Sequence, residues 1–247
     1  MSEPSSTPGD PKPPAFATTR WSLVAAAGRD ASASLTELCV RYWYPVFAHA
    51  RRCGHPPDVA QAITQAFFHH LVGERLAEVG RDPPRRFRDW LLAELARFMA
   101  HEWRGRPVQR PAAELLAPLP VALLEQRHVA EGVAPPSAEL GFRRSFALEV
   151  LARAFNRLRR EARQAGREAM FDRLEPFMTL EPGPGDYAAL AEALGTRPLS
   201  LVVALKRLRQ RFRELADEEL AETVADANEF AAERAALLEA LRGAGAP

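Results

Sequence analysis

The chain has 247 residues, and its 33 Lys and Arg nearly balance its 32 Asp and Glu to give a formal net charge of +1. This length accommodates one large or two modest domains, and the near-neutral balance excludes nucleic-acid binding through overall charge alone. The apolar fraction of 47%, with Ala and Leu dominant and few β-branched runs, predicts an all-α protein.

Several functional classes find no support in the sequence. No window approaches 18 uninterrupted apolar residues, and no basic start precedes an apolar core, so we expect a cytoplasmic protein without a membrane segment. Cys39 and Cys53 form neither a CxxC pair nor a disulfide framework, and we expect buried or idle thiols. Phosphate-loop, dinucleotide and nucleophile-elbow motifs are absent, and no HExxH pattern occurs among the histidines. We therefore expect no enzyme, no cofactor and no metal.

The first half of the chain predicts a leader and a helical domain. Residues 1–15 are expected to be disordered, because five Pro with Ser, Thr, Gly and Asp cannot bury enough surface to order themselves. Residues 16–106 are expected to form a compact helical domain, in which Pro57 and Asp58 mark a helix start and Pro45 marks a kink. Its main helices are expected at 32–54, 58–76 and 87–103.

The second half predicts a linker, a second domain and an acidic extension. Six Pro between Pro107 and Pro136 indicate an interdomain linker over 107–137, with short docked apolar pieces. The second domain, 138–225, opens with a long amphipathic helix over about 138–166. Residues 226–247 are expected to be an acidic helical extension.

Residues 186–213 have the pattern of a helix-turn-helix. Tyr187, Leu190, Ala191 and Leu194 share one face of a first helix, Gly195 can take the positive φ that ends it, and Pro198 suits the next first turn. The second helix carries five cations and no acid between Arg197 and Glu214: Lys206, Arg207, Arg209, Arg211 and Arg213. Such a helix is suited to phosphate, although an ordinary helical hairpin with a solvated basic face has the same pattern.

The acids that follow allow two interpretations. Between Glu214 and the C-terminus there are nine acids against two Arg. These acids can fold back over Arg207 and Arg211 and hide them, or they can simply solvate a long helix.

Four blocks, in this order and spacing, carry a family resemblance over roughly residues 16–225. They are FATTRWSLVAAAG, LCVRYWYPVFAHARRCGHPPDVAQAITQAFFHHL, FRDWLLAELARFMAHEW and DYAALAEALGTRPLSLVVALKRLRQRFREL. The chain resembles bacterial RNA polymerase sigma factors of the extracytoplasmic-function, sigma-70, type. The resemblance implies a DNA-binding transcription initiation factor with a sigma region-2-like helix bundle, a Pro-rich linker and a region-4-like helix-turn-helix domain. Its partners would be core RNA polymerase and promoter DNA, and an anti-sigma or other regulatory protein is a further candidate.

The resemblance also implies three sets of contact residues. Capture of a melted promoter strand requires cations for the backbone and rings for base stacking; the candidates are Arg88, Trp90, Arg97, His101, Trp103, Arg104 and Arg106, with a core position as the alternative for Trp90 and Trp103. The helix-turn-helix would contact DNA through Arg197, Ser200, Lys206, Arg207, Arg209 and Arg211, mainly at the backbone. The polymerase would be bound through Asp58, Gln61, Gln65 and Phe68.

The sequence departs from the family pattern at four positions in the helices that carry these contact residues. Ala62 and Ala66 stand where the family usually has acids, and Pro198 and Val202 stand where it commonly has a Glu and a basic residue. Leu199, Leu201, Val202, Val203 and Leu205 make the second helix unusually apolar. A second interpretation therefore stays open: a sigma-like helical protein with weakened DNA contacts that binds a protein partner.

Overall fold

A computed structural model describes residues 31–71, 86–103, 120–132, 136–224 and 226–242, with only the backbone for residues 31–39. The described residues are helical and contain no strand, which confirms the all-α prediction for them. One isolated antiparallel bridge joins Arg86 to Val224. The expected leader, the TTRWSLV block and residues 107–119 of the expected linker lie outside the described residues.

The N-terminal helices surround α2 (Ala31–Arg52). Every residue from Arg41 to Ala50 in α2 is buried, as expected of a helix that packs on all sides. Trp43 stacks on Phe68 with ring centroids 5.4 Å apart, and Tyr42 stacks on Phe146 at 5.1 Å. The bundle is completed by α3 (Pro57–His70), α5 (Phe87–Arg97), the π-helical turn η2 (Phe98–Glu102) and α6 (Val121–Ala130).

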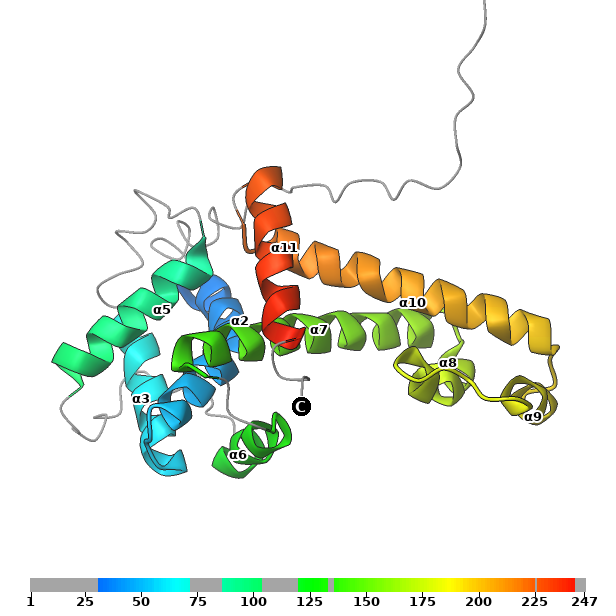
Figure 1. The fold of residues 1–247 in the computed structure, drawn as a ribbon, viewed down its shortest axis with the longest axis horizontal. Helices are drawn as coiled ribbons and strands as arrows, with labels where there is room; N and C mark the ends of the chain where they lie inside the picture. The colour runs from blue at the N-terminus through cyan, green and yellow to red at the C-terminus, as the bar shows by residue number, and fades with distance from the viewer. Residues whose placement is uncertain (1–30, 72–85, 104–119, 133–135, 225, 243–247) are drawn as a thin grey trace, which may run out of the picture.

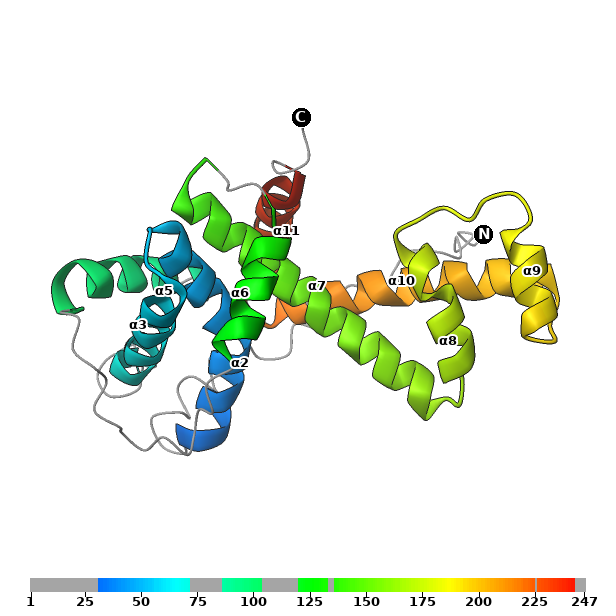
Figure 2. The ribbon, with the colours of Figure 1, turned by 90° about the horizontal axis from the view of Figure 1, so that it is seen from below.

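Two long helices extend from this bundle. The first, α7 (Ala138–Gln164), is capped at its N-terminus by the Ser137 hydroxyl, which accepts a hydrogen bond from the Leu140 amide. Gly166, with φ of 66°, follows its end. The second, α10 (Pro198–Ala221), returns beside α7, and α8 (Glu168–Leu174), the 3₁₀ turn η3 (Glu175–Met178) and α9 (Asp186–Ala193) connect them at the distal end (Figures 1 and 2).

The last helix, α11 (Ala227–Arg242), crosses the middle of the molecule, where α7 and α10 meet the N-terminal bundle (Figure 1). It packs mainly against α7. Glu229 pairs with Arg86, and Glu233 pairs with Arg88, so that α11 is also tied to the start of α5.

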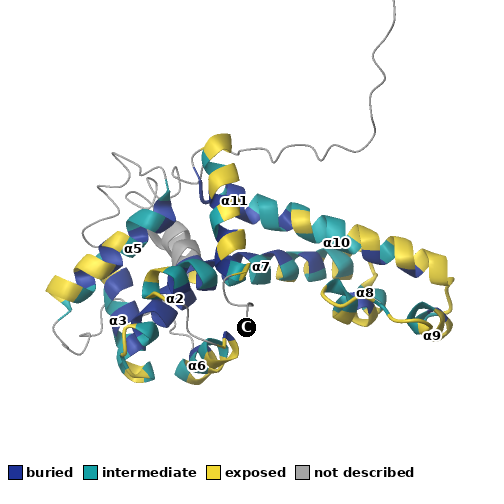
Figure 3. Ribbon diagram, viewed as in Figure 1, coloured by how far each residue is buried: buried dark blue, intermediate teal, exposed yellow. Residues whose placement is uncertain are grey.

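Three hydrophobic clusters follow one another along this framework. The largest joins the N-terminal helices to the first part of α7, through Phe142 and Phe146, and to Leu220 and Leu237. The second lies between α7, α8 and α10, and the third between α8, α9 and α10. Figure 3 shows burial concentrated in the N-terminal bundle and along the facing sides of α7 and α10. The first part of the helix expected to open the second domain thus packs in the core of the first.

Two further expectations meet the structure here. Cys53 is exposed, so of the two expectations, a buried or an idle thiol, only the idle one stays a prediction for it; its position in the turn after α2 explains the exposure. Among the described residues no single helix has the length and hydropathy of a membrane span, although the bent pair α9 and α10 reaches both when its two helices are taken together.

Candidate nucleic-acid interface

The distal end of the molecule contains the helix-turn-helix that the sequence predicts. The axes of α9 and α10 differ in direction by 100°, and helix-turn-helix pairs typically cross at about 90–120°. Four residues, 194–197, separate the two helices. The break between the helices lies where the sequence places it, at Gly195 and Thr196.

Local chemistry explains this turn. Gly195 has φ of 60°, a left-handed conformation that glycine adopts without the steric cost of a Cβ. The Thr196 amide then donates to the Ala191 carbonyl at 2.9 Å, which satisfies one of the last acceptors of α9. Pro198 is the first residue of α10, where its missing N–H costs no helical hydrogen bond.

A small core of its own holds the helix-turn-helix in shape. Leu201 and Leu205 of α10 are buried against Ala191 of α9 and Leu174 of α8. Tyr187, Leu190 and Leu194, the other members of the predicted face of α9, pack around them. The third helix of the unit is therefore α8 (Glu168–Leu174), followed by η3.

The opposite face of α10 is exposed over its first turns (Figure 3). Apolar and basic side chains share it. Leu199 is 73% exposed, Val202 40% and Val203 41%, which is unusual for three neighbouring large apolar residues. The polar members of this exposed face are Ser200, Lys206 and Arg207, with Arg197 just before the helix.

Five cations on α10 or directly before it fall into two groups. Arg209 donates to the Phe177 and Leu180 carbonyls and to Glu181, and Arg211 pairs with Glu161, Glu214 and Glu218. These two guanidinium groups are half-buried and engaged within the protein, and the expectation that they contact DNA stays a prediction. Arg197, Lys206 and Arg207 are exposed, and within the described residues none of the three forms an ion pair.

Two grooves flank the exposed face of α10. One, of about 460 Å³, lies between α7, α8 and α10, and Ser200, Val203 and Arg207 are among its lining residues. The other, of about 550 Å³, lies between η3, α9 and α10, and its lining includes Val202 and Lys206. The exposed face therefore forms a ridge between two depressions.

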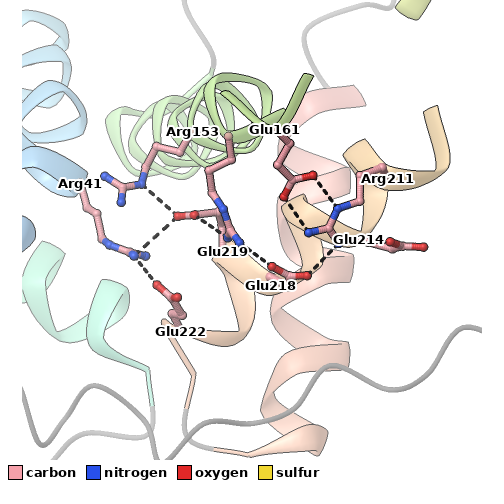
Figure 4. A network of polar contacts seen from close by, with 9 residues as sticks. Arg41, Arg153, Glu161, Arg211, Glu214, Glu218, Glu219 and Glu222 are labelled. Atoms are coloured by element: carbon pink, nitrogen blue, oxygen red, sulfur yellow. Dashed lines mark hydrogen bonds and ion pairs between the residues drawn. The ribbon is translucent and has the colours of Figure 1, made fainter. Parts of the chain in front are cut away.

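Further along α10, ion pairs join its acidic side chains to arginines of α7 and α2 (Figure 4). Glu219 is buried and accepts hydrogen bonds from Arg153 at 3.0 Å and Arg157 at 2.9 Å, while Arg41 of α2 lies 3.6 Å from it. Burial opposes ionisation of Glu219, but these cations outweigh burial and hold its pKa below the ordinary value. The network anchors the C-terminal half of α10, so that only its first turns project.

The Glu161–Arg211 pair closes this network at its distal end. Two parallel hydrogen bonds, at 2.9 and 2.8 Å, join the carboxylate to the guanidinium. They lower the pKa of the Glu161 carboxyl and raise that of Arg211.

The expected strand-capture surface does not assemble as an exposed basic face in the described residues. Arg88 is only 1% exposed and forms a buried pair with Glu233, so the expectation that it contacts DNA is contradicted. Trp90 and Trp103 are half-buried against the largest cluster, which agrees with the core alternative, and Arg97 pairs with Glu94 and Glu102. His101 is exposed, and Arg104 and Arg106 lie outside the described residues.

The expected polymerase-binding residues divide in the same way. Asp58 is exposed, and Gln61 and Gln65 are half-buried on α3. Phe68 is completely buried and stacks on Trp43, so a direct contact to another protein is contradicted for this residue. The sequence carries a signal for this burial, because Phe68 lies in an aromatic-rich helix at the spacing of core residues.

The acidic C-terminal extension does not cover the basic part of α10. Arg211 is paired by Glu214 and Glu218 of its own helix and by Glu161 of α7, whereas α11 packs mainly on α7 and forms ion pairs with the start of α5. Glu233 neither covers α10 nor lies in solvent, because it is buried in its pair with Arg88. Phe230, Leu237 and Ala240 recur at helical spacing around it, and this pattern places a carboxylate on the buried face.

The described residues contain no group of three or more His, Cys, Asp or Glu that could hold a metal ion.

No protein-family model, no curated protein and no solved structure matches the chain.

Proposed function

We propose that the chain is a DNA-binding transcription initiation factor that binds core RNA polymerase and directs it to promoters, with α9 and α10 as its helix-turn-helix. One observation carries the proposal: two helices at 100° over their own small core present Arg197, Lys206 and Arg207 on an exposed, projecting face. The second helix of such a motif enters the major groove with its first turns, and these are the turns that project here.

The proposal includes two functional units and a cytoplasmic location. The helix-turn-helix unit, α8 to the first half of α10, would contact duplex DNA, and the N-terminal bundle would bind the polymerase. Support for the bundle's role comes from the order of the four sequence blocks. Arg104 and Arg106, rather than the buried Arg88, are then the cations expected at a melted promoter strand.

Salt dependence tests the DNA contact. Each neutralised phosphate contributes about −0.9 to the slope of log affinity against log salt, so three exposed cations predict a slope of about −2.7. Affinity for a generic duplex should then fall about 40-fold between 50 and 200 mM salt. Replacing Lys206 and Arg207 together with Ala should reduce the magnitude of the slope by about 1.8 and weaken binding to all sequences alike.

A matched control uses Arg234 and Arg242 of α11. Replacing both with Ala removes the same net charge from exposed positions on another helix. Fluorescence anisotropy with a labelled duplex should show no change in slope for this control. Equal losses in the two double variants would refute a specific role for α10.

Binding to purified bacterial core RNA polymerase tests the second half of the proposal. The chain should co-elute with the core enzyme in gel filtration and support initiation from a fragment of its own genome. If the chain binds DNA but neither co-elutes nor supports initiation, the proposal reduces to a DNA-binding protein of another kind.

A second candidate function is a helical interaction protein, favoured by the exposure of Leu199, Val202 and Val203. It predicts no measurable binding to duplex DNA at 50 mM salt. It also predicts that a partner isolated with the native protein is retained by the Lys206 and Arg207 double variant, because apolar contacts depend little on these charges.

A further inference from the structure

The centre of the exposed face of α10 is apolar rather than basic. Successive residues in an α-helix are separated by about 100°, so Leu199, Val203 and Lys206 lie within an arc of about 60°. Ser200 and Arg207 follow on one side of this arc, and Val202 on the other. All six side chains are exposed. A surface that approaches this helix head-on therefore meets Leu199 and Val203 first, with Lys206 one turn further along.

This exposure is not a defect of packing. Leu201 and Leu205, on the opposite side of the same turns, already occupy the small core, with 0% and 2% exposure. Leu199 and Val203 thus cannot turn inward without displacing them. The helix therefore exposes Leu199 and Val203 although its inner face is already packed by other leucines.

The edges of base pairs in the major groove differ in what they offer such side chains. Guanine, adenine and cytosine present hydrogen-bonding groups that would lose water against Leu or Val without gaining a partner. Thymine also presents a C5-methyl group, which makes a favourable apolar contact. Only a base with this methyl group gains from lying against Leu199 or Val203.

We infer that Leu199 and Val203 select base pairs that carry a methyl group in the major groove, which in unmodified DNA is thymine. This inference rests on the DNA-binding function proposed above and names its sequence preference. Lys206, Arg207 and Arg197 hold the backbone without regard to sequence, and the two apolar side chains distinguish thymine from the other bases. The same chemistry extends to 5-methylcytosine, whose methyl group occupies the equivalent position.

Two alternating duplexes test the inference because they differ only in this methyl group. Poly(dA-dT) contains thymine, and poly(dA-dU) contains uracil, which has the same hydrogen-bonding groups and the same backbone charge. The full chain should bind poly(dA-dT) more tightly, by about fourfold for each methyl group that is buried. A corresponding preference for 5-methylcytosine is expected in alternating G–C duplexes with and without the modification.

Two variants separate the methyl contact from the backbone contact. Leu199→Ser combined with Val203→Ser removes the apolar centre and should abolish the preference for thymine over uracil. Both positions are exposed, and an unchanged helical circular dichroism spectrum would show that the fold is kept. The Lys206 and Arg207 double Ala variant should bind both duplexes more weakly while keeping their ratio.

The outcomes distinguish this inference from the proposed function. Equal, salt-sensitive binding of the wild-type chain to both duplexes would overturn the inference and leave DNA binding intact. A thymine preference that persists in the Leu199 and Val203 variant would also overturn it, because the preference would then come from the stiffness of the DNA. No binding to any duplex at 50 mM salt would refute the DNA-binding function itself, and with it the inference.

Discussion

The pair between Arg88 and Glu233 yields a quantitative prediction about how α11 is held. Both carboxylate oxygens of Glu233 accept from Arg88, at 2.6 and 2.8 Å, and both residues are 1% exposed. Replacing Glu233 with Ala leaves a buried guanidinium, and breaking a buried pair in this way costs about 3–5 kcal/mol. Asp89, 3.0 Å from Arg88 and half-exposed, keeps part of the compensation, so we expect the lower end, about 3 kcal/mol.

The assay is urea unfolding followed by circular dichroism, together with a thermal melt. For a chain of this size, about 3 kcal/mol corresponds to a fall in melting temperature of roughly 6–12 °C. Glu229→Ala is the matched control, because Glu229 lies one turn earlier on α11 and pairs with the more exposed Arg86. That pair is only partly buried, with side-chain exposures of 30% for Arg86 and 17% for Glu229, so this control should cost less than Glu233→Ala.

A double replacement separates the pair from the helix that carries it. Arg88→Met with Glu233→Leu substitutes apolar groups of similar volume and should recover most of the stability that Glu233→Ala loses. If Glu233→Ala destabilises no more than Glu229→Ala, the reasoning from burial is wrong and α11 is not held by this pair.

Four further predictions concern stability. Gly141→Ala usually stabilises a helix by about 1 kcal/mol, but here it should destabilise the protein because the new Cβ would lie 2.5 Å from Arg52 Cδ. In an Arg52→Ala background the same change should stabilise it. If chemical denaturation shows a stability change of the same sign in both backgrounds, the clash is contradicted. Gly195→Ala should cost about 1 kcal/mol through its positive φ and weaken DNA binding, whereas binding equal to wild type would show that the turn tolerates the change. Burial lowers the pKa of His49, so the free energy of unfolding should be highest above pH of about 6.5 and fall as the pH drops below it. His49→Gln should remove this loss from the pH profile of unfolding. The lowered pKa of Glu219 predicts a second loss below pH of about 4.3, as its carboxylate becomes protonated, and Glu219→Gln, already destabilised at pH 7, should lack that step.

Several elements of the fold follow from signals that act over a few residues. The break at Gly195, the start of α10 at Pro198 and the length of α7 depend on backbone freedom, a missing N–H and apolar periodicity. Each of these acts within one or two helical turns, so each can be read from the adjacent sequence. The predicted face of α9 is confirmed for the same reason.

The candidate interface was predicted less completely. Five cations on α10 looked equivalent in the sequence, yet Arg209 and Arg211 are engaged within the protein. Their partners come from other elements, at Phe177 and at Glu161, 50 residues before Arg211 in the chain. No local pattern shows which cation will find such a partner.

Three features follow from local sequence alone: the helical character of the described residues, the positions at which α9 and α10 begin, and the mixed basic and apolar character of α10. Which charges remain exposed depends on the packing of distant segments. Glu233 lies 145 residues from Arg88 in the chain, and their pairing withdraws one cation from the surface expected to bind DNA. Helix signals act between neighbours in sequence. The cost of burying a charge depends instead on whether the fold places an opposite charge beside it, and that charge can come from anywhere in the chain.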